Sequence, residues 1–110
     1  MKRELTLENM RPMFQRYEVR ANRGKPRIWL EGKRLDHAGF TVGARYNLDI
    51  VGGLIRMRLA EDGARKVSGK GERPIVDLSG RSCEPYTTGD PVLVEYHPSG
   101  LVLIKFAGMG

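Results

Sequence analysis

PRIWLEGKRLDHAGFTVGARYNLDIVGGLIRMRL, residues 26–59, is followed by a second version of itself at residues 74–106, PIVDLSGRSCEPYTTGDPVLVEYHPSGLVLIKF. At an offset of 48, both stretches begin with proline, carry apolar residues at the third and fifth positions and have glycine at the seventh. A two-residue deletion then matches Gly43 with Gly89, and a one-residue insertion matches Gly53-Leu54-Ile55 with Gly100-Leu101-Val102. Because an internal repeat sets the architecture of a chain, the sequence predicts one small structural unit built twice.

The matched positions alternate between apolar and other residues, which is typical of the inner face of a half-buried strand. The apolar positions are Ile28, Leu30, Tyr46, Leu48 and Ile50 in the first copy, and Val76, Leu78, Val92, Val94 and Tyr96 in the second. Gly52-Gly53 and Ser99-Gly100 separate pairs of strand-like runs, where a hairpin turn needs positive φ. We therefore expect a mainly β fold.

One short helix is predicted at Lys33–Ala38, and Gly39 is expected to end it. The matching segment 82–88 contains Pro85 and two threonines, which disfavour a second helix. Upstream of the first copy, Arg3–Leu7 and Arg16–Arg20 can each form a strand, and 22–24 (Asn-Arg-Gly) forms a turn.

The segment between the copies, EDGARKVSGKGER, is charged and rich in glycine, and it predicts a flexible connector. At 110 residues the chain has the size of one domain. We expect a single domain over 1–110, with the first half-unit and its upstream segment at 1–59, the connector at 60–73 and the second half-unit at 74–110.

The net charge of +6 is unevenly distributed along the chain. Residues 1–59 hold 13 basic and 6 acidic residues, residues 60–73 hold 4 and 3, and residues 74–110 hold 2 and 4. A concentrated basic surface attracts polyanions through its field and through counterion release, although a charge excess can also serve solubility alone. The first half-unit is therefore the expected binding half.

We expect a cytoplasmic protein with no membrane segment. No apolar run approaches the roughly 18–20 residues that span a bilayer, and the start, MKRELTLENM, lacks the apolar stretch of a secretory signal. Cys83 is the only cysteine, so no internal disulfide can form. Because Cys83 aligns with the apolar Leu35, we expect a buried and unreactive thiol.

The first copy follows the pattern P-x-I-x-L-x-G-x-x-L-x-x-A-G-F-x-x-G and then a hairpin. The pattern is carried by Pro26, Ile28, Leu30, Gly32, Leu35, Ala38-Gly39-Phe40, Gly43 and Gly53-Leu54-Ile55. In these residues the copy resembles the SymE toxin family, within the AbrB/MazE superfamily of swapped-hairpin β-barrels, and Leu5-Thr6-Leu7 is similar to the N-terminal strand of that family. The second copy lacks the AGF element and resembles the AbrB type only in its apolar skeleton.

This resemblance implies a fold and an assembly. AbrB-type units are half-barrels, and two of them interleave their hairpins to close one sheet. The implied fold is a small AbrB-like swapped-hairpin barrel built from two tandem half-units in one chain, with one short helix. Closure would remove exposed sheet edges. The chain would be a monomeric pseudo-dimer or a homodimer.

The resemblance also implies a nucleic-acid-binding surface, since basic residues around the first strand of the superfamily commonly face DNA. Carried over by position, these residues are Lys25, Arg27, Lys33 and Arg34. Arg20 and Arg23 would extend the surface, Arg56 and Arg58 should share one face because they flank Met57, and the second copy adds Arg73 and Arg81. Trp29 and Tyr46 could stack on bases, and for Trp29 burial is the other possibility.

Three functions follow from these observations. The first is a nucleic-acid-binding protein of the AbrB/SymE type, with DNA favoured over RNA as partner, contacting the phosphate backbone. The second is a SymE-like toxin that attacks or sequesters nucleic acid, and the third is a protein-binding module whose second half inhibits or pairs with another protein. No catalytic constellation is evident, His37 and His97 lack metal-ligand spacing to Cys83, and no cofactor is expected; nuclease activity would rest on the family resemblance alone.

Overall fold

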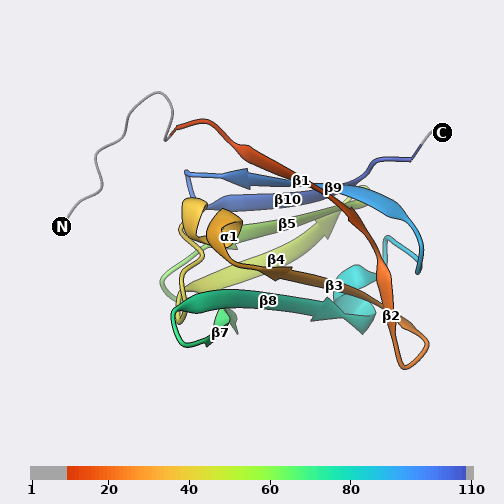
Figure 1. Ribbon diagram of the computed structural model, residues 1–110, viewed down its shortest axis with the longest axis horizontal. Coiled ribbons are helices and arrows are strands. Elements are labelled where there is room, and N and C mark those ends of the chain that lie inside the picture. The colour runs from red at the N-terminus through yellow and green to blue at the C-terminus, as the bar shows by residue number, and fades with distance from the viewer. Residues whose placement is uncertain (1–9, 109–110) are drawn as a thin grey trace.

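The structure, a computed structural model, describes residues 10–108. The strand expected at Arg3–Leu7 and the Leu5-Thr6-Leu7 match lie outside the described residues. The described chain is mainly β, as predicted: two antiparallel sheets face each other, and one short helix lies at one end of the sheets (Figure 1).

The elements occur in the same order twice along the chain. The first unit contains β1 (Met13–Glu18), β2 (Arg20–Asn22), β3 (Lys25–Glu31), α1 (Lys33–His37), β4 (Arg45–Val51) and β5 (Leu54–Leu59). The second unit contains β6 (Arg65–Lys66), β7 (Ser68–Lys70), β8 (Arg73–Ser79), the 3-10 turn η1 (Gly80–Cys83), β9 (Pro91–His97) and β10 (Leu101–Phe106). The repeat predicted from the sequence is thus present, and each copy is longer than the sequence match indicates.

The flexible connector predicted at 60–73 is wrong, because this segment belongs to the second structural unit. This segment contains β6 and β7, and Val67 between them is 2% exposed. Its N–H donates to the carbonyl of Ala44 at 2.8 Å, and its carbonyl accepts from Gly43 at 2.9 Å. Val19 makes the equivalent bonds with Asp90 and Gly89, at 2.9 and 2.8 Å, from the same position of the first unit. Both valines are buried where the chain passes from one sheet to the other.

The two units are interlocked through their strand pairing. The six-stranded sheet has the order β1-β9-β10-β5-β4-β6, and the four-stranded sheet has the order β2-β3-β8-β7. Apart from the hairpins within each unit, every pairing joins the two units: β1 with β9, β3 with β8, β5 with β10 and β4 with β6. Trp29 lies opposite Asp77, and Arg56 lies opposite Leu103. Each of these pairs joins equivalent positions of the repeat, so an approximate two-fold axis passes through both sheet centres.

The core lies between the sheets and confirms the predicted alternation. Of the predicted inward positions, those that are buried are Ile28, Leu30, Tyr46, Val76, Leu78, Val92, Val94 and Tyr96. Leu48 is partly buried against this core. Ile50 is an exception, 40% exposed near the tip of the β4–β5 hairpin.

The local predictions are mostly confirmed. The helix α1 forms within the predicted segment, and Gly39, with φ of +81°, follows its end. The matching segment of the second unit begins with η1 and contains no α-helix. The strand expected at Arg16–Arg20 is divided, because the buried Val19 interrupts it between β1 and β2. Within residues 10–108, no helix is long and apolar enough to cross a membrane.

Candidate nucleic-acid interface

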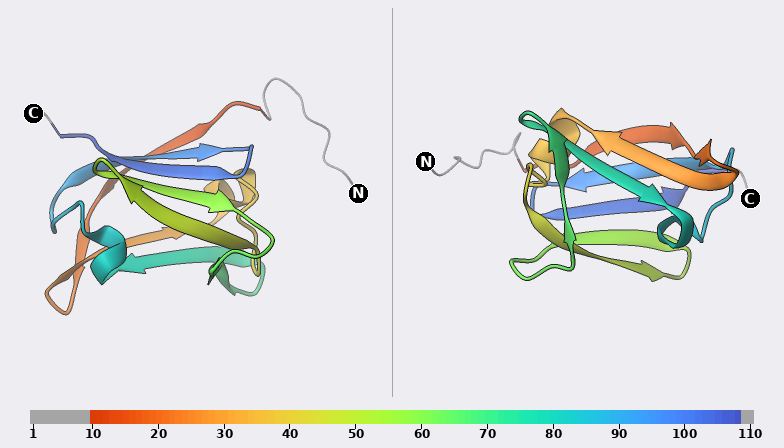
Figure 2. Two further views of the ribbon diagram at one scale, coloured as in Figure 1. Left: turned by 180° about the vertical axis from the view of Figure 1, so that it is seen from behind. Right: turned by 90° about the horizontal axis from the view of Figure 1, so that it is seen from below.

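The four-stranded sheet turns one face outward (Figure 2, right). This outer face carries the largest group of the predicted basic residues. Since Ile28 and Leu30 point into the core, Arg27 and Trp29 face outward. Arg20 on β2 lies directly opposite Arg27 and therefore shares its face. Lys25 follows the same alternation along β3, and Arg73 occupies this face on β8.

Two of these cations are held in ion pairs. Arg27 forms a two-pronged pair with Asp77, with both N–O distances at 2.9 Å, and this hydrogen bonding raises the pKa of Arg27. The Arg27 guanidinium carbon also lies 4.8 Å from the centroid of the Trp29 ring. Arg73 pairs with Glu31 at 3.2 Å and holds the pKa of that carboxyl below its usual range. The charge of both arginines is thereby partly neutralised on the sheet.

Four other cations of this face and its hairpins are exposed and have no ion pair among residues 10–108: Arg20, Arg23, Lys25 and Lys70. Arg23 lies in the turn between β2 and β3, and Lys70 lies opposite Arg73 beside the turn between β7 and β8. These two turns are at opposite ends of the sheet (Figures 1 and 2). We call these four residues the basic face.

Lys70 was missed by the sequence reasoning because its segment looked like a connector. The signal that could have found it is Val67, which stands 48 residues after Val19. With this offset, the repeat extends upstream, and residues 68–70 correspond to β2. Just as β2 pairs with the start of β3, 68–70 form β7 and pair with the start of β8.

The structure does not bring all ten predicted residues together. Arg56 and Arg58 share one face, as predicted, but this is the outer face of the six-stranded sheet. There, Arg56 pairs with Asp49 at 2.6 Å, and this lowers the pKa of Asp49. The ten residues therefore belong to more than one surface.

The remaining three predicted residues lie at the two ends of the sheets. Lys33 and Arg34 are on α1, at the end where the β7–β8 turn also lies (Figure 1). Arg81 is on η1, at the end where the β2–β3 turn lies. All three are exposed, so each can extend one end of the basic face.

A cleft opens beside the basic face, between β1 and β3. On the N-terminal side of Val19 the chain diverges from β3, because β1 pairs with β9 in the other sheet while β2 and β8 pair with β3. The Trp29 backbone N–H then finds no strand partner there and donates to the Tyr17 hydroxyl at 3.0 Å. The opening forms two adjoining hollows of about 340 and 540 Å³, both lined by Tyr17, Arg20, Trp29 and Glu31.

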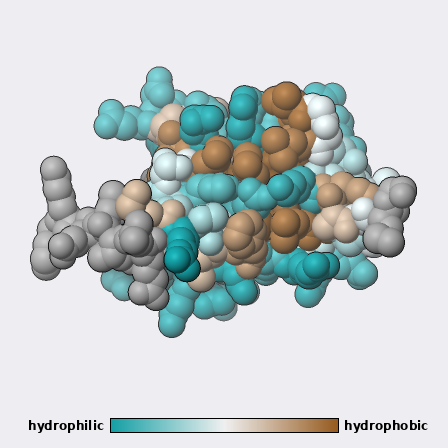
Figure 3. All heavy atoms as spheres, turned by 90° about the horizontal axis from the view of Figure 1, so that it is seen from above, coloured by the Kyte–Doolittle hydropathy of each residue, from teal (hydrophilic) through white to brown (hydrophobic). Residues whose placement is uncertain are grey.

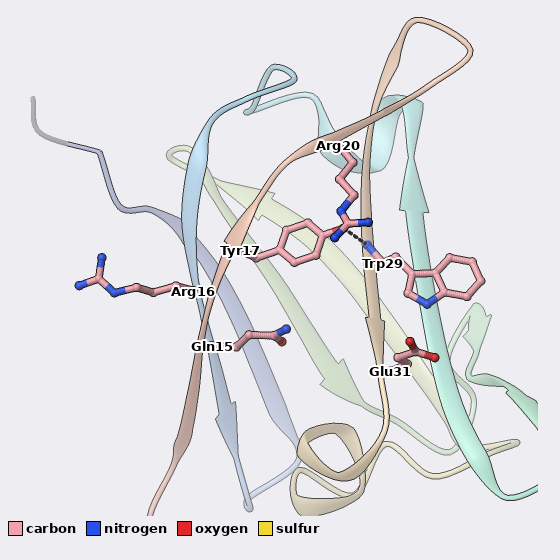
Figure 4. A pocket seen from close by; sticks show the side chains of 6 residues that line it. All are labelled: Gln15, Arg16, Tyr17, Arg20, Trp29 and Glu31. Carbon is pink, nitrogen blue, oxygen red and sulfur yellow. Dashed lines mark hydrogen bonds between the residues drawn. The ribbon is translucent and has the colours of Figure 1, made fainter.

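Figure 4 shows how the residues of this cleft lie. Tyr17 reaches from β1 towards β3, and Gln15 extends below it. The Trp29 indole extends from β3 away from Tyr17, over the outer face of the four-stranded sheet. Arg16 also borders the cleft, but its side chain points away from it.

The other polar groups that the sequence singled out are occupied in structural contacts. His37 lies 2.6 Å from the carbonyl oxygen of Arg11, and His97 lies 3.1 Å from the Glu95 carboxylate. Within the described part of the chain, no three His, Cys, Asp or Glu residues are grouped to hold a metal ion.

Two sequence predictions concern buried side chains. Cys83 is fully buried, as predicted, and burial raises the pKa of its thiol to about 11. Tyr46 is 4% exposed and packs against Phe40, so the suggestion that it stacks on bases is wrong. Its strand turns it into the core because the neighbouring Arg45 and Asn47 take the exposed positions.

Comparisons of this chain with protein-family models, with curated proteins and with solved structures found no match. The resemblance to the SymE family and the AbrB/MazE superfamily therefore stays a prediction from the residues.

Proposed function

We propose that this chain is a nucleic-acid-binding protein that contacts the phosphate backbone through the basic face of its four-stranded sheet. The observation that carries the proposal is the placement of Arg20, Arg23, Lys25 and Lys70 on one face and its hairpins, exposed and without an ion pair among the described residues. Cationic side chains that neutralise phosphates release the counterions condensed on the nucleic acid. This release supplies most of the free energy of non-specific binding.

The dimensions of the face support a strand-like polyanion as ligand. β3 and β8 have seven residues each, so each extends over roughly 23 Å at about 3.3 Å per residue. The free cations lie at both ends of this length, and each end also carries a paired arginine, because Arg27 lies opposite Arg20 and Arg73 lies opposite Lys70. Such a row follows several consecutive phosphates, whereas a small anion would need the cations to converge on one point.

Two double variants with the same charge change test this proposal. In R23E/K25E, two exposed cations of the basic face are reversed. In R58E/K66E, two exposed cations of the six-stranded sheet are reversed, and neither forms an ion pair among the described residues. We expect the first to lower affinity for labelled DNA and RNA at least tenfold in fluorescence anisotropy, and the second to change it little. Equal losses in both variants would show that only net charge matters and would contradict the proposal.

A second candidate function, protein binding, is favoured by the outer face of the six-stranded sheet. Apolar side chains gather there in strips separated by a hydrophilic band (Figure 3). Phe14 is 52% exposed, and the half-buried Leu93, Leu101 and Leu103 come from β9 and β10 of the second unit. Exposed apolar patches often mark protein interfaces. Recovery of a stoichiometric protein partner that is lost in L101E/L103E, together with no affinity for nucleic acid, would favour this function. The toxin function rests on the family resemblance and has no further support.

A further inference from the structure

We propose that an unpaired nucleobase stacks on Trp29 beside the cleft between β1 and β3, so that the preferred ligand is single-stranded nucleic acid. This inference rests on the proposed function, and it adds a class of ligand to it. A row of cations alone does not distinguish a duplex from a single strand, whereas an outward-facing indole and base-sized hollows beside that row do.

Trp29 provides the aromatic surface on which a base can stack. Trp29 is half-buried and faces outward beside Arg20, and the Arg27 guanidinium occupies one side of its indole at 4.8 Å from the ring centroid. Asp77 holds that guanidinium in place through two hydrogen bonds of 2.9 Å. A base stacked on the opposite side of the indole would complete a guanidinium–indole–base stack, in which each layer attracts the next.

The polar groups of the cleft suit the edge of a base. The Tyr17 hydroxyl oxygen accepts the Trp29 N–H, so the hydroxyl hydrogen remains available to a ligand. The Gln15 carbonyl oxygen accepts a hydrogen bond of 2.6 Å from the Tyr96 hydroxyl, which turns the two amide hydrogens of Gln15 away from Tyr96. Glu31 stays ionised through Arg73 and provides an acceptor. Donors on β1 and an acceptor on β3 therefore line the cleft next to the residue on which the base would stack.

The position of the cleft relative to the basic face supplies the phosphate contact. Arg20 lines the cleft, and its guanidinium carbon lies 5.9 Å from the centroid of the Tyr17 ring. Arg20 also belongs to the basic face, so one cation serves both surfaces. A nucleotide whose phosphate lies on Arg20 would have its base at the cleft. A base within a duplex cannot reach Trp29 unless it leaves its stack, which costs a few kcal/mol.

Trp29 is the only tryptophan of the chain, so its fluorescence reports this site alone. The probes are a thymidine oligomer of about ten nucleotides, within the site sizes of single-strand-binding folds, the same oligomer without bases, and a duplex with as many phosphates. We expect the thymidine oligomer to quench Trp29 and to bind about tenfold more tightly than the other two. The oligomer without bases should cause no quenching.

Variants separate stacking from charge. W29L should lose about tenfold in affinity for the thymidine oligomer by anisotropy, as expected for one lost stacking contact, and W29F should lose less because it keeps an aromatic ring. The matched control is F14L, which removes an exposed aromatic residue on the six-stranded sheet. Circular dichroism checks that each variant folds. If W29L does not fold, W29F still tests the stacking contact.

The outcomes distinguish this inference from the proposed function. Equal affinity for the oligomers with and without bases, an unchanged Trp29 spectrum and full affinity in W29F and W29L would overturn the cleft as a base site, while a loss in R23E/K25E would keep the basic face. Tighter binding of the duplex would overturn the preference for single strands. No salt-dependent affinity for any of the three probes would overturn the proposed function itself.

Discussion

At the scale of the residue, Arg23 is the position where stability and binding are expected to conflict. Its φ is +55°, the one positive value at a non-glycine residue within 10–108. This left-handed conformation costs an L-residue about 1–2 kcal/mol. The next residue, Gly24, has φ of +79°, and such two-residue hairpin turns favour Asn-Gly. A strained arginine at the tip of the basic face is explained if its charge contributes to function.

We predict that R23N stabilises the fold and weakens binding. Asparagine tolerates the left-handed region, so the free energy of unfolding in a urea titration should rise by about 0.5–1 kcal/mol. The same variant removes a cation of the basic face, and its affinity for nucleic acid should fall. The control variant N22S changes the last residue of β2, next to Arg23, and keeps the positive charge of Arg23. It should leave the affinity for nucleic acid unchanged. A variant R23N that is less stable or binds more tightly would contradict this explanation.

Cys83 gives a prediction for pH dependence. Burial raises the pKa of the folded thiol to about 11, above the value of about 8.5 for a free cysteine. A raised pKa means that the thiol contributes fully to stability below about pH 8.5 and that this contribution is lost as the pH rises towards 11. At pH 8, a thiol reagent should therefore react slowly with the native chain and rapidly in denaturant. Rapid stoichiometric reaction of the native chain, at the rate of an S68C/C83A variant with its exposed thiol, would show that Cys83 is accessible.

At the scale of the element, the sequence predicted the strands that carry alternating apolar residues and missed those that do not. β3, β5, β8 and β10 bury every second residue, so their pattern is local. β6 has two residues and β7 reads Ser-Gly-Lys, so neither carries a pattern. They are strands because their backbones pair with β4 and β8, which is a tertiary effect that no local window contains.

The candidate site, too, could be predicted from the sequence only where it depends on the local alternation of residues. The outward position of Arg27 and the shared face of Arg56 and Arg58 followed from alternation alone. Their assignment to opposite sheets did not, because it depends on the crossing of the chain at Val19 and Val67. The cleft beside Trp29 was unpredictable for the same reason, since it exists where β1 leaves one sheet for the other.

We predict that V19A and V67A destabilise the fold by similar amounts. Each removes a fully buried side chain at an equivalent crossing between the sheets, and the loss should be about 1–3 kcal/mol in chemical denaturation. The exposed neighbour S68A should change the free energy of unfolding by less than about 0.5 kcal/mol. If 60–73 were a flexible connector, V67A would behave like S68A.

At the scale of the whole molecule, the interlocked pairing makes neither unit independent. Without the second unit, β1 loses its only partner, and β3, β4 and β5 each lose one of their two partners. The hairpins of the first unit alone are marginally stable at best. The chain should therefore unfold in one cooperative transition, although the repeat contains two similar units.

Splitting the chain between Glu61 and Asp62, both exposed, tests this interlocking. The two fragments should each lack the dispersed amide spectrum of a folded protein by NMR, and an equimolar mixture should recover the spectrum of the intact chain. A matched mixture in which the second fragment carries V67A should require higher concentrations to assemble. A first fragment that folds alone would contradict the interlocked architecture.

The central claim is that phosphates bind to the basic face, and the most direct test is the salt dependence of affinity. The logarithm of the binding constant for a labelled single strand is measured against the logarithm of salt concentration between about 50 and 200 mM. We predict a linear fall, with a slope that becomes about 1.4 shallower in R23E/K25E, at roughly 0.7 per lost contact, and unchanged in R58E/K66E. A wild-type affinity that does not depend on salt, or a slope that changes equally in both variants, would contradict the account.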